Sequence, residues 1–206
     1  MNKIIISIMF LSLTLLTGCC NPSTDTPPAS VKLAETEYSD LSEDLSSYEF
    51  KIDGVIYNLP ADYSVFVSNG WTLSDEDSTQ TIVKGLYTTN SSDLTKDDKT
   101  LYAQFLNAGA PSNKITDCKV GSICAYDDKA SMILPEGITI GLSVNDLKAA
   151  YGEPDEIKIY DSESLKDSRY YQYYPNGEND SRCCFSIGIN NKTNLVSSIS
   201  VSNLSY

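Results

Sequence analysis

The feature that most restricts the fold of this 206-residue chain is a strict alternation of side chains near its carboxyl end. In residues 182–189 every second side chain is apolar or a thiol: Cys183, Phe185, Ile187 and Ile189. The side chains between them are small: Cys184, Ser186 and Gly188. A period of two is typical of a β-strand that is buried on one side. We therefore expect an antiparallel sheet with one covered face and one face open to solvent.

A short helix and four strands account for the second half of the folded part, residues 131–206. Ser143 is a good N-cap, apolar side chains follow it at helical spacing, and Gly152 ends the pattern, which predicts a helix over 143–151. Turn sequences separate four extended segments after it: 157–160, 169–174, 182–189 and 195–202. We predict one helix followed by a four-stranded antiparallel meander.

The first half of the folded part, residues 48–130, has a similar order of elements. Asp53-Gly54 lies between two alternating segments, which predicts a hairpin with a two-residue turn. A short helix is expected over 63–69. Strands are expected at 81–87, 101–107 and 118–126. The polar segment 88–99 is interpreted as an exposed loop.

These elements predict an α+β protein in which short helices pack on antiparallel sheet. Each half contains Leu-Pro, then a short helix that ends at glycine, then strands. The halves are therefore interpreted either as two tandem helix-plus-meander modules, 48–130 and 131–206, or as a coincidence of common turn residues.

The amino terminus has the pattern of a lipoprotein signal peptide. In residues 1–18 a lysine precedes a mainly apolar run that is too short to span the roughly 30 Å hydrocarbon core of a bilayer. The run ends in Leu16-Thr17-Gly18-Cys19, where small residues precede a cysteine as in the bacterial lipobox. We predict that 1–18 are removed and that the thiol of Cys19 carries diacylglycerol. The alternatives are an ordinary signal peptide or a short membrane anchor.

Between the lipid and the folded part, residues 19–47 are predicted to form a flexible acidic linker. Proline, serine and threonine dominate 21–30, a composition typical of an extended spacer. A lipid anchor with two or three acyl chains holds a protein stably on a membrane. We therefore expect a protein that is anchored to the cell membrane on its extracytoplasmic face.

Two sets of motifs resemble known families. The segment 133–157, in which Gly141 precedes a capped helix and Tyr151-Gly152-Glu153-Pro154-Asp155 opens a strand, resembles the β-lactamase-inhibitor fold and the small SmpA/OmlA-type envelope lipoproteins. The chain from 48 to 206 also looks like the small lipoproteins of anaerobic Gram-positive bacteria. The motifs of that likeness are Ile52-Asp53-Gly54, Tyr57, Leu59-Pro60 and Gly70-Trp71. The resemblance implies helices on one face of a four-stranded sheet and a role in binding proteins, and it supplies no catalytic residue.

Four cysteines lie in the folded part: Cys118, Cys124, Cys183 and Cys184. An even number of cysteines in an exported chain suggests disulfides. Cys118 and Cys124 would be about 20 Å apart along one strand, whereas a bridge needs Cα atoms within about 7 Å. The workable pairing therefore joins segment 118–126 to segment 182–189. The alternative is four reduced thiols that act as small buried side chains.

A run of tyrosines, Arg-Tyr-Tyr-Gln-Tyr-Tyr, occupies residues 169–174. On a strand, Tyr170 and Tyr174 point to one face and Tyr171 and Tyr173 point to the other. One pair must face the core, so the other pair would lie on the open face, where tyrosine is favoured at interfaces. These four tyrosines are the candidate interface. The alternative is a strand of high β-propensity with partly buried rings.

Charge and composition exclude several classes of function. The net charge is −13 and histidine is absent. An acidic surface repels phosphate backbones, so nucleic acid is not an expected partner. Without imidazole there is no Ser–His or Cys–His nucleophile, and the sequence contains no nucleotide-binding loop. No cysteines have C-x-x-C spacing, so neither a zinc site nor a cofactor is predicted.

The sequence therefore favours a non-catalytic protein-binding or envelope interaction module, held on the membrane through Cys19, with a protein as its partner. The alternative is an envelope hydrolase that uses a pair of carboxylates. A chain with 28 acidic residues supplies many such pairs, so the sequence alone does not discard this class.

Overall fold

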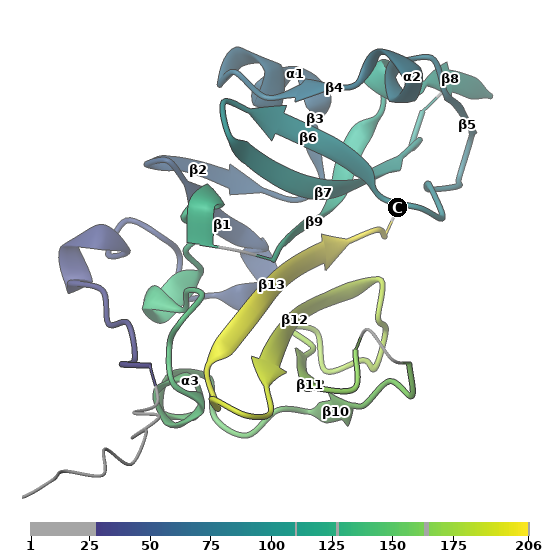
Figure 1. Cartoon of the computed structure of the whole chain (residues 1–206). Coiled ribbons are helices and arrows are strands. Elements are labelled where there is room, and N and C mark those ends of the chain that lie inside the picture. Colours follow the sequence, from purple (N-terminus) through teal and green to yellow (C-terminus); the bar gives the residue numbers. More distant parts are fainter. Residues whose placement is uncertain (1–27, 110, 127, 163–164, 206) are drawn as a thin grey trace, which may run out of the picture.

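The computed structural model describes residues 28–109, 111–126, 128–162 and 165–205. Its main feature is a nine-stranded antiparallel sheet in the order β10-β11-β12-β13-β9-β7-β6-β4, with β3 pairing separately with β9. In Figure 1 the sheet extends from the yellow and green strands of the carboxyl-terminal half to the teal and blue strands of the amino-terminal half. The predicted α+β class with antiparallel sheet is confirmed.

The strands of the large sheet come from both halves of the chain. The second half supplies β10 (Glu156–Lys158), β11 (Ser168–Tyr173), β12 (Cys183–Asn190) and β13 (Val196–Asn203). The first half supplies β3 (Ala61–Asp62), β4 (Thr72–Leu73), β6 (Ser92–Lys96), β7 (Lys99–Leu106) and β9 (Lys119–Ala125). Two small sheets pair β1 (Glu49–Ile52) with β2 (Val55–Asn58), and β5 (Thr81–Val83) with β8 (Ser112–Lys114). Each extended segment predicted in the second half overlaps one of these strands.

The helices are short. They are α1 (Tyr63–Ser68), α2 (Asp75–Ser78) and α3 (Val144–Tyr151), with 3-10 turns η1 (Glu35–Glu37), η2 (Leu45–Ser47), η3 (Ile115–Asp117), η4 (Asp128–Ala130) and η5 (Pro135–Gly137). Helix α3 begins as predicted, because the Ser143 hydroxyl accepts a hydrogen bond from the backbone N–H of Asp146 at 3.1 Å. It ends at Gly152, whose φ of +78° is favourable only for glycine.

The two halves meet where β13 pairs with β9. Ser200 lies opposite Cys124 and Ser202 lies opposite Ser122, so the last strand of each half forms the centre of the sheet. Each half thus supplies a short helix and a meander, β4-β6-β7-β9 in the first and β10-β11-β12-β13 in the second. The halves share one sheet and one buried cluster, so they are not separate folding units in space. That they arose as a repeat stays a prediction.

One face of the sheet is covered by the β1–β2 hairpin, α1 and α3 (Figure 1). Aromatic rings link these layers. The Tyr57 and Phe66 rings stack with centroids 4.6 Å apart, Tyr48 stacks on Phe185 at 5.9 Å, and Tyr151 meets Tyr173 edge to face at 5.3 Å. Such contacts add about 0.5–1.5 kcal/mol each beyond burial of area. The hydrophobic core therefore lies on this face of the sheet. The opposite face is not covered by these helices or by the hairpin.

Strand β6 lies inside segment 88–99, which the sequence analysis assigned to an exposed loop, so that interpretation was wrong. The strand pairs along its whole length with β7, from Ser92 opposite Ala103 to Lys96 opposite Lys99. Leu94 alone carries a large apolar side chain to the core, where it is fully buried. Pairing with the longer strand β7 holds β6 in place. Because most of its residues are polar, the sequence of β6 gives no clear signal for a strand.

The flexible linker predicted over 19–47 does not extend to position 47, because described residues before position 48 contact the folded part. The backbone N–H of Val31 donates to the carbonyl of Gly141 at 2.9 Å, and Lys51 pairs with Asp40 at 2.8 Å. Leu41 is buried. The predicted signal peptide, the lipid-bearing Cys19 and the start of the linker lie outside the described residues. Within the described residues, no helix combines the length and the apolar character needed to cross a membrane.

A charged cluster ties the first hairpin to the sheet. Asp53 and Gly54 both have positive φ, as the predicted two-residue turn requires. The Asp53 carboxylate pairs with Lys99 and, at 3.1 Å, with Lys96. Partial burial alone would raise the pKa of Asp53, but hydrogen bonds from the two lysines outweigh it and the pKa is lowered.

We predict that Asp53→Asn destabilises the protein by about 1 kcal/mol at pH 7, because both ion pairs are lost while asparagine still tolerates the turn conformation. Since the folded-state pKa is lowered, the stabilisation is complete above the unfolded pKa, near 4, and disappears as the pH falls through the folded value. Urea unfolding of both proteins at pH 7 and at pH 3 measures this. An equal cost at both pH values would contradict the assignment.

Candidate functional site

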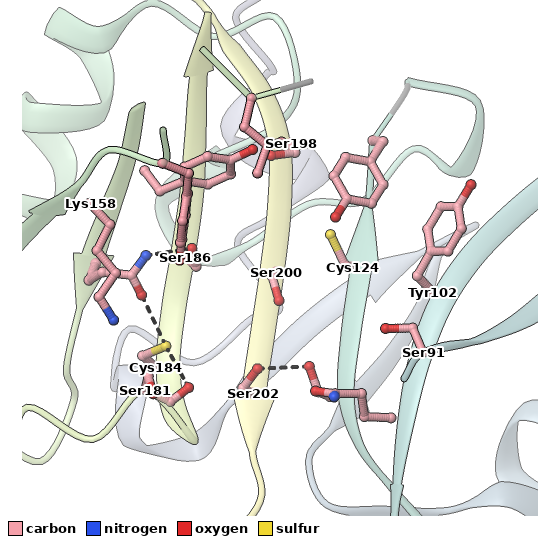
Figure 2. Close-up of a pocket in the computed structure, with 17 residues that line it drawn as sticks. Ser91, Tyr102, Cys124, Lys158, Ser181, Cys184, Ser186, Ser198, Ser200 and Ser202 are labelled. Carbon is pink, nitrogen blue, oxygen red and sulfur yellow. Dashed lines mark hydrogen bonds between the residues drawn. The ribbon is translucent and has the colours of Figure 1, made fainter. Parts of the chain in front are cut away.

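The face of the sheet opposite the core contains a groove with a volume of about 340 Å³. Five serines of three adjacent strands form its floor: Ser122, Ser186, Ser198, Ser200 and Ser202. Two amides and two thiols lie beside them: Gln104, Gln172, Cys124 and Cys184. Four tyrosines stand at its sides: Tyr102, Tyr126, Tyr160 and Tyr170. The rest of the described lining is Ser91, Lys158, Leu165 and Ser181. We call this site the polar groove. In Figure 2, Ser198, Ser200 and Ser202 lie in line along β13.

The strand register explains why these residues meet. One row across the sheet contains, in order, Tyr102, Cys124, Ser200, Ser186 and Gln172. The next row contains Gln104, Ser122, Ser202 and Cys184. Side chains two residues apart on a strand point to the same face, so rows from both halves of the chain face the same way. The groove therefore exists only because β9 and β13 are paired.

Two pairs of tyrosines stand on opposite sides of the floor. Tyr102, on β7, and Tyr126, the residue after β9, meet edge to face with centroids 5.2 Å apart. Tyr160 and Tyr170, on the β10–β11 side, meet in the same way at 5.3 Å. Strands β12 and β13 lie between the two pairs. The tyrosine pairs therefore form two walls with a small-residue floor between them.

Gly188 makes room for one of these walls. A Cβ atom at this position would lie 2.1 Å from the Ser198 hydroxyl and 3.2 Å from a ring carbon of Tyr170. The Tyr170 ring therefore lies across the glycine, close to the surface of the sheet. A ring that covers a glycine in this way supports the strand pairing that the missing side chain would otherwise weaken.

Some floor groups are already paired and others are not. The Ser122 and Ser202 hydroxyls share a hydrogen bond of 2.7 Å across the seam, and the Gln172 amide donates to Ser186 at 2.6 Å. Ser198 and Ser200, by contrast, have no side-chain hydrogen bond to any described residue. The part of the floor formed by Ser198 and Ser200 therefore offers free hydroxyls, while the other floor serines are hydrogen-bonded.

Charge is almost absent from the polar groove. None of the described residues that line it is aspartate or glutamate, and Lys158 is its one lysine. Lys158 is itself 3.6 Å from Glu156, which accepts a hydrogen bond from Tyr174 and does not line the groove. Among the described residues, no three acidic or cysteine side chains are grouped so that they could hold a metal ion.

Both thiols in the groove are protonated at neutral pH. Burial raises the pKa of Cys124 to about 11, with a hydrogen bond to Tyr126 lowering it in part, and burial likewise raises the pKa of Cys184 to about 11. The pKa of Tyr126 is raised chiefly by Cys124, and that of Tyr170 by burial. A nucleophilic cysteine needs its thiolate, so neither thiol is activated for catalysis.

The predicted disulfide between segments 118–126 and 182–189 is not formed, and all four cysteines are free. Cys124 lies on β9 and Cys184 on β12, with β13 between them. Two strand spacings place their Cα atoms more than about 9 Å apart, beyond the reach of a bridge. Cys118 precedes β9, is buried and donates to the carbonyl of Lys114, and Cys183 is directed at Asn203.

The candidate tyrosine interface is corrected in part. Tyr171 and Tyr173 are buried against α3, as one pair had to be. Tyr174 is buried too, because β11 ends at Tyr173 and the chain turns so that the Tyr174 hydroxyl reaches Glu156 at 2.6 Å. Only Tyr170 of the four lines the polar groove.

Cys124 and Cys184 also line the groove, although the sequence singled them out as disulfide candidates, and the remaining groove residues were not singled out. The alternation in β12 and β13 does place Ser186, Ser200 and Ser202 on the open face, so this signal was present. Tyr102 and Tyr126 belong to the first half, and their position opposite Tyr170 depends on the pairing of β9 with β13. No local pattern encodes that pairing.

Comparisons of the chain with protein-family models, with curated proteins and with solved structures find no match. The resemblance to the β-lactamase-inhibitor fold and to small envelope lipoproteins therefore stays a prediction.

We predict that iodoacetamide alkylates Cys124 slowly at pH 7, with a rate that rises about tenfold per pH unit without a plateau up to pH 10. The reason is the raised pKa, which leaves little thiolate at lower pH. Mass spectrometry of the Cys124 peptide gives the rate at each pH. Restricted access would lower all rates equally and leave the slope intact. A plateau below pH 8 would contradict the account and reveal an activated thiol.

Proposed function

We propose that this protein is a lipid-anchored, non-catalytic binding module of the cell envelope, and that the polar groove is its binding surface. The observation that carries the proposal is the groove itself, a walled surface opposite the core whose described lining is polar and, apart from Lys158, uncharged. A surface of this size with several hydrogen-bonding groups matches the small end of ligand-binding sites, about 300–1,000 Å³.

The chemistry of the groove favours binding over catalysis. The hydrolase alternative needs two carboxylates that face one another across a reacting bond. The described lining residues supply none, and the thiols of Cys124 and Cys184 stay protonated. Hydroxyl and amide groups of ordinary acidity hold a ligand but do not move its protons at neutral pH.

The sequence supports the proposed location of the protein on the membrane. Residues 1–19 have the charge, length and small residues that a lipoprotein signal requires. The net charge of −13 would keep the folded part away from an anionic lipid surface, so the groove would remain accessible beside the membrane.

We predict that Cys19→Ala releases the protein from the membrane or leaves its precursor uncut, because diacylglycerol has no thiol to join. Membrane fractionation and the mass of the mature chain measure both effects. Cys20→Ala is the matched control, and it should fractionate as the wild type does. Normal membrane association and processing of Cys19→Ala would refute the anchor.

We also predict that a photoreactive phenylalanine at Tyr160 forms adducts with envelope components on intact cells, whereas the same residue at Val67 does not. Tyr160 is a groove wall that is 45% exposed, so an aromatic replacement leaves the fold intact. Val67 is similarly exposed but lies on α1, away from the groove. Adducts separated by gel electrophoresis give the comparison. Equal adducts from both positions would remove the groove as the binding surface.

A further inference from the structure

Two serines of the groove floor, Ser198 and Ser200 on β13, have hydroxyls without a partner among the described residues. Ser198 is only 6% exposed, lines the groove and has no side-chain hydrogen bond to a described residue. Ser200, two residues further along the same strand, is also without one. A hydroxyl with no protein partner, on a residue that is itself largely buried, can form a hydrogen bond with a ligand that lies in the groove.

The groups around these serines can both donate and accept hydrogen bonds. Serine and tyrosine hydroxyls and glutamine amides all have this double capacity, whereas carboxylates only accept and ammonium groups only donate. The groove has seven such groups on its floor and rows, five serines and two glutamines, together with the tyrosine hydroxyls. A ligand rich in hydroxyls complements these side chains, because each ligand hydroxyl can also donate or accept a hydrogen bond, whichever is needed at its position.

The walls add a second kind of contact. Tyr126 is 57% exposed and Tyr160 is 45% exposed, so each ring presents open surface beside the floor. The face of an aromatic ring is electron-rich and attracts the slightly positive C–H groups of a flat, saturated ring. A pyranose sugar has this combination: hydroxyls at its edge and C–H groups on its face.

The composition of the groove differs from that of a protein interface. Interface centres are apolar, and serine is depleted there. In the groove, serines form the floor and Leu165 is the one aliphatic side chain among the described lining residues. A protein partner would place its apolar centre against several serine hydroxyls. Those hydroxyls would lose water without gaining hydrogen bonds, so the groove does not have the composition of a protein interface.

Charge restricts the ligand further. The chain has a net charge of −13, yet the described lining residues include no carboxylate, and Lys158 already lies near Glu156. A groove whose one charged lining residue is a lysine near Glu156 has no carboxylate to hold a strongly basic ligand, and the field of the acidic protein repels an acidic one. The complementary ligand is therefore uncharged.

We propose that the polar groove binds a neutral glycan, a chain of uncharged sugar units that lies along β13 between the two tyrosine pairs. Ser198 and Ser202 are about 13 Å apart along the strand, which limits the bound part to a few sugar units. This inference rests on the proposed function, since it names the class of ligand for the same groove.

The test is a titration of the mature lipidated protein, in detergent micelles, with linear tetrasaccharides of glucose, of mannose and of N-acetylglucosamine. The tetrasaccharide of galacturonate serves as the charged counterpart. We expect at least one neutral tetrasaccharide to bind with a Kd of about 1 mM or lower. Tyr126→Ala should weaken that binding about tenfold, because it removes one stacking ring.

Two further variants make the result specific. Ser200→Leu should abolish binding by filling the floor, while Tyr87→Ala, which removes a partly exposed tyrosine outside the groove, should bind as the wild type does. Because Tyr126 is mostly exposed, its alanine variant keeps the fold even if Ser200→Leu does not.

The outcomes separate the inference from the proposed function. If no neutral tetrasaccharide binds, or if galacturonate binds more tightly, the glycan inference is overturned. Should the photoreactive residue at Tyr160 then still form adducts with a protein, the groove remains a binding surface with a different ligand. If neither sugars nor envelope components engage the groove, both proposals fail together.

Discussion

The pairing of β9 with β13 is the interaction on which the rest of this structure depends. On one face of this seam, Ile123, Ile199 and Val201 are fully buried in the shared core. On the other face, Ser122 and Ser202 share a hydrogen bond across it. Because the two strands end the two halves of the chain, their pairing joins two meanders into one sheet. The polar groove spans this seam and draws its two tyrosine walls from different halves.

The two faces of the sheet have different roles: one contributes to stability and the other carries the polar groove. Burial of aromatic and aliphatic side chains under α1, α3 and the first hairpin stabilises the fold on one side, where apolar area removed from water contributes about 25 cal/mol per Å². Small polar side chains on the other side add little to that core. Their hydroxyls, two thiols of raised pKa and few charges form a surface suited to holding an uncharged ligand. Stability and recognition can therefore change independently.

Local patterns were sufficient for much of the fold. The period-two alternation of 182–189, the serine cap and glycine stop around α3, and Asp53-Gly54 in its turn all act within a few residues, so each was readable from sequence. Strand β6 was missed because Leu94 is its one large apolar side chain and pairing with β7 holds the strand in place. Less of the site could be predicted from the sequence. The open face of the sheet followed from the alternation of side chains. The tyrosine walls of the groove depend on which strands are neighbours, which no local pattern shows. Tyr174 does not lie on the open face because β11 ends at Tyr173.

The central claim is that the polar groove is occupied in the native envelope. Chemical footprinting of tyrosines tests it without knowledge of the ligand. Tyr126 and Tyr160 line the groove and are exposed, whereas Tyr87 is partly exposed and lies outside it. Iodination rates should be compared between intact cells and the purified protein in micelles. The account predicts that Tyr126 and Tyr160 react more slowly on cells while Tyr87 is unchanged. Equal rates for all three tyrosines in both settings would contradict it.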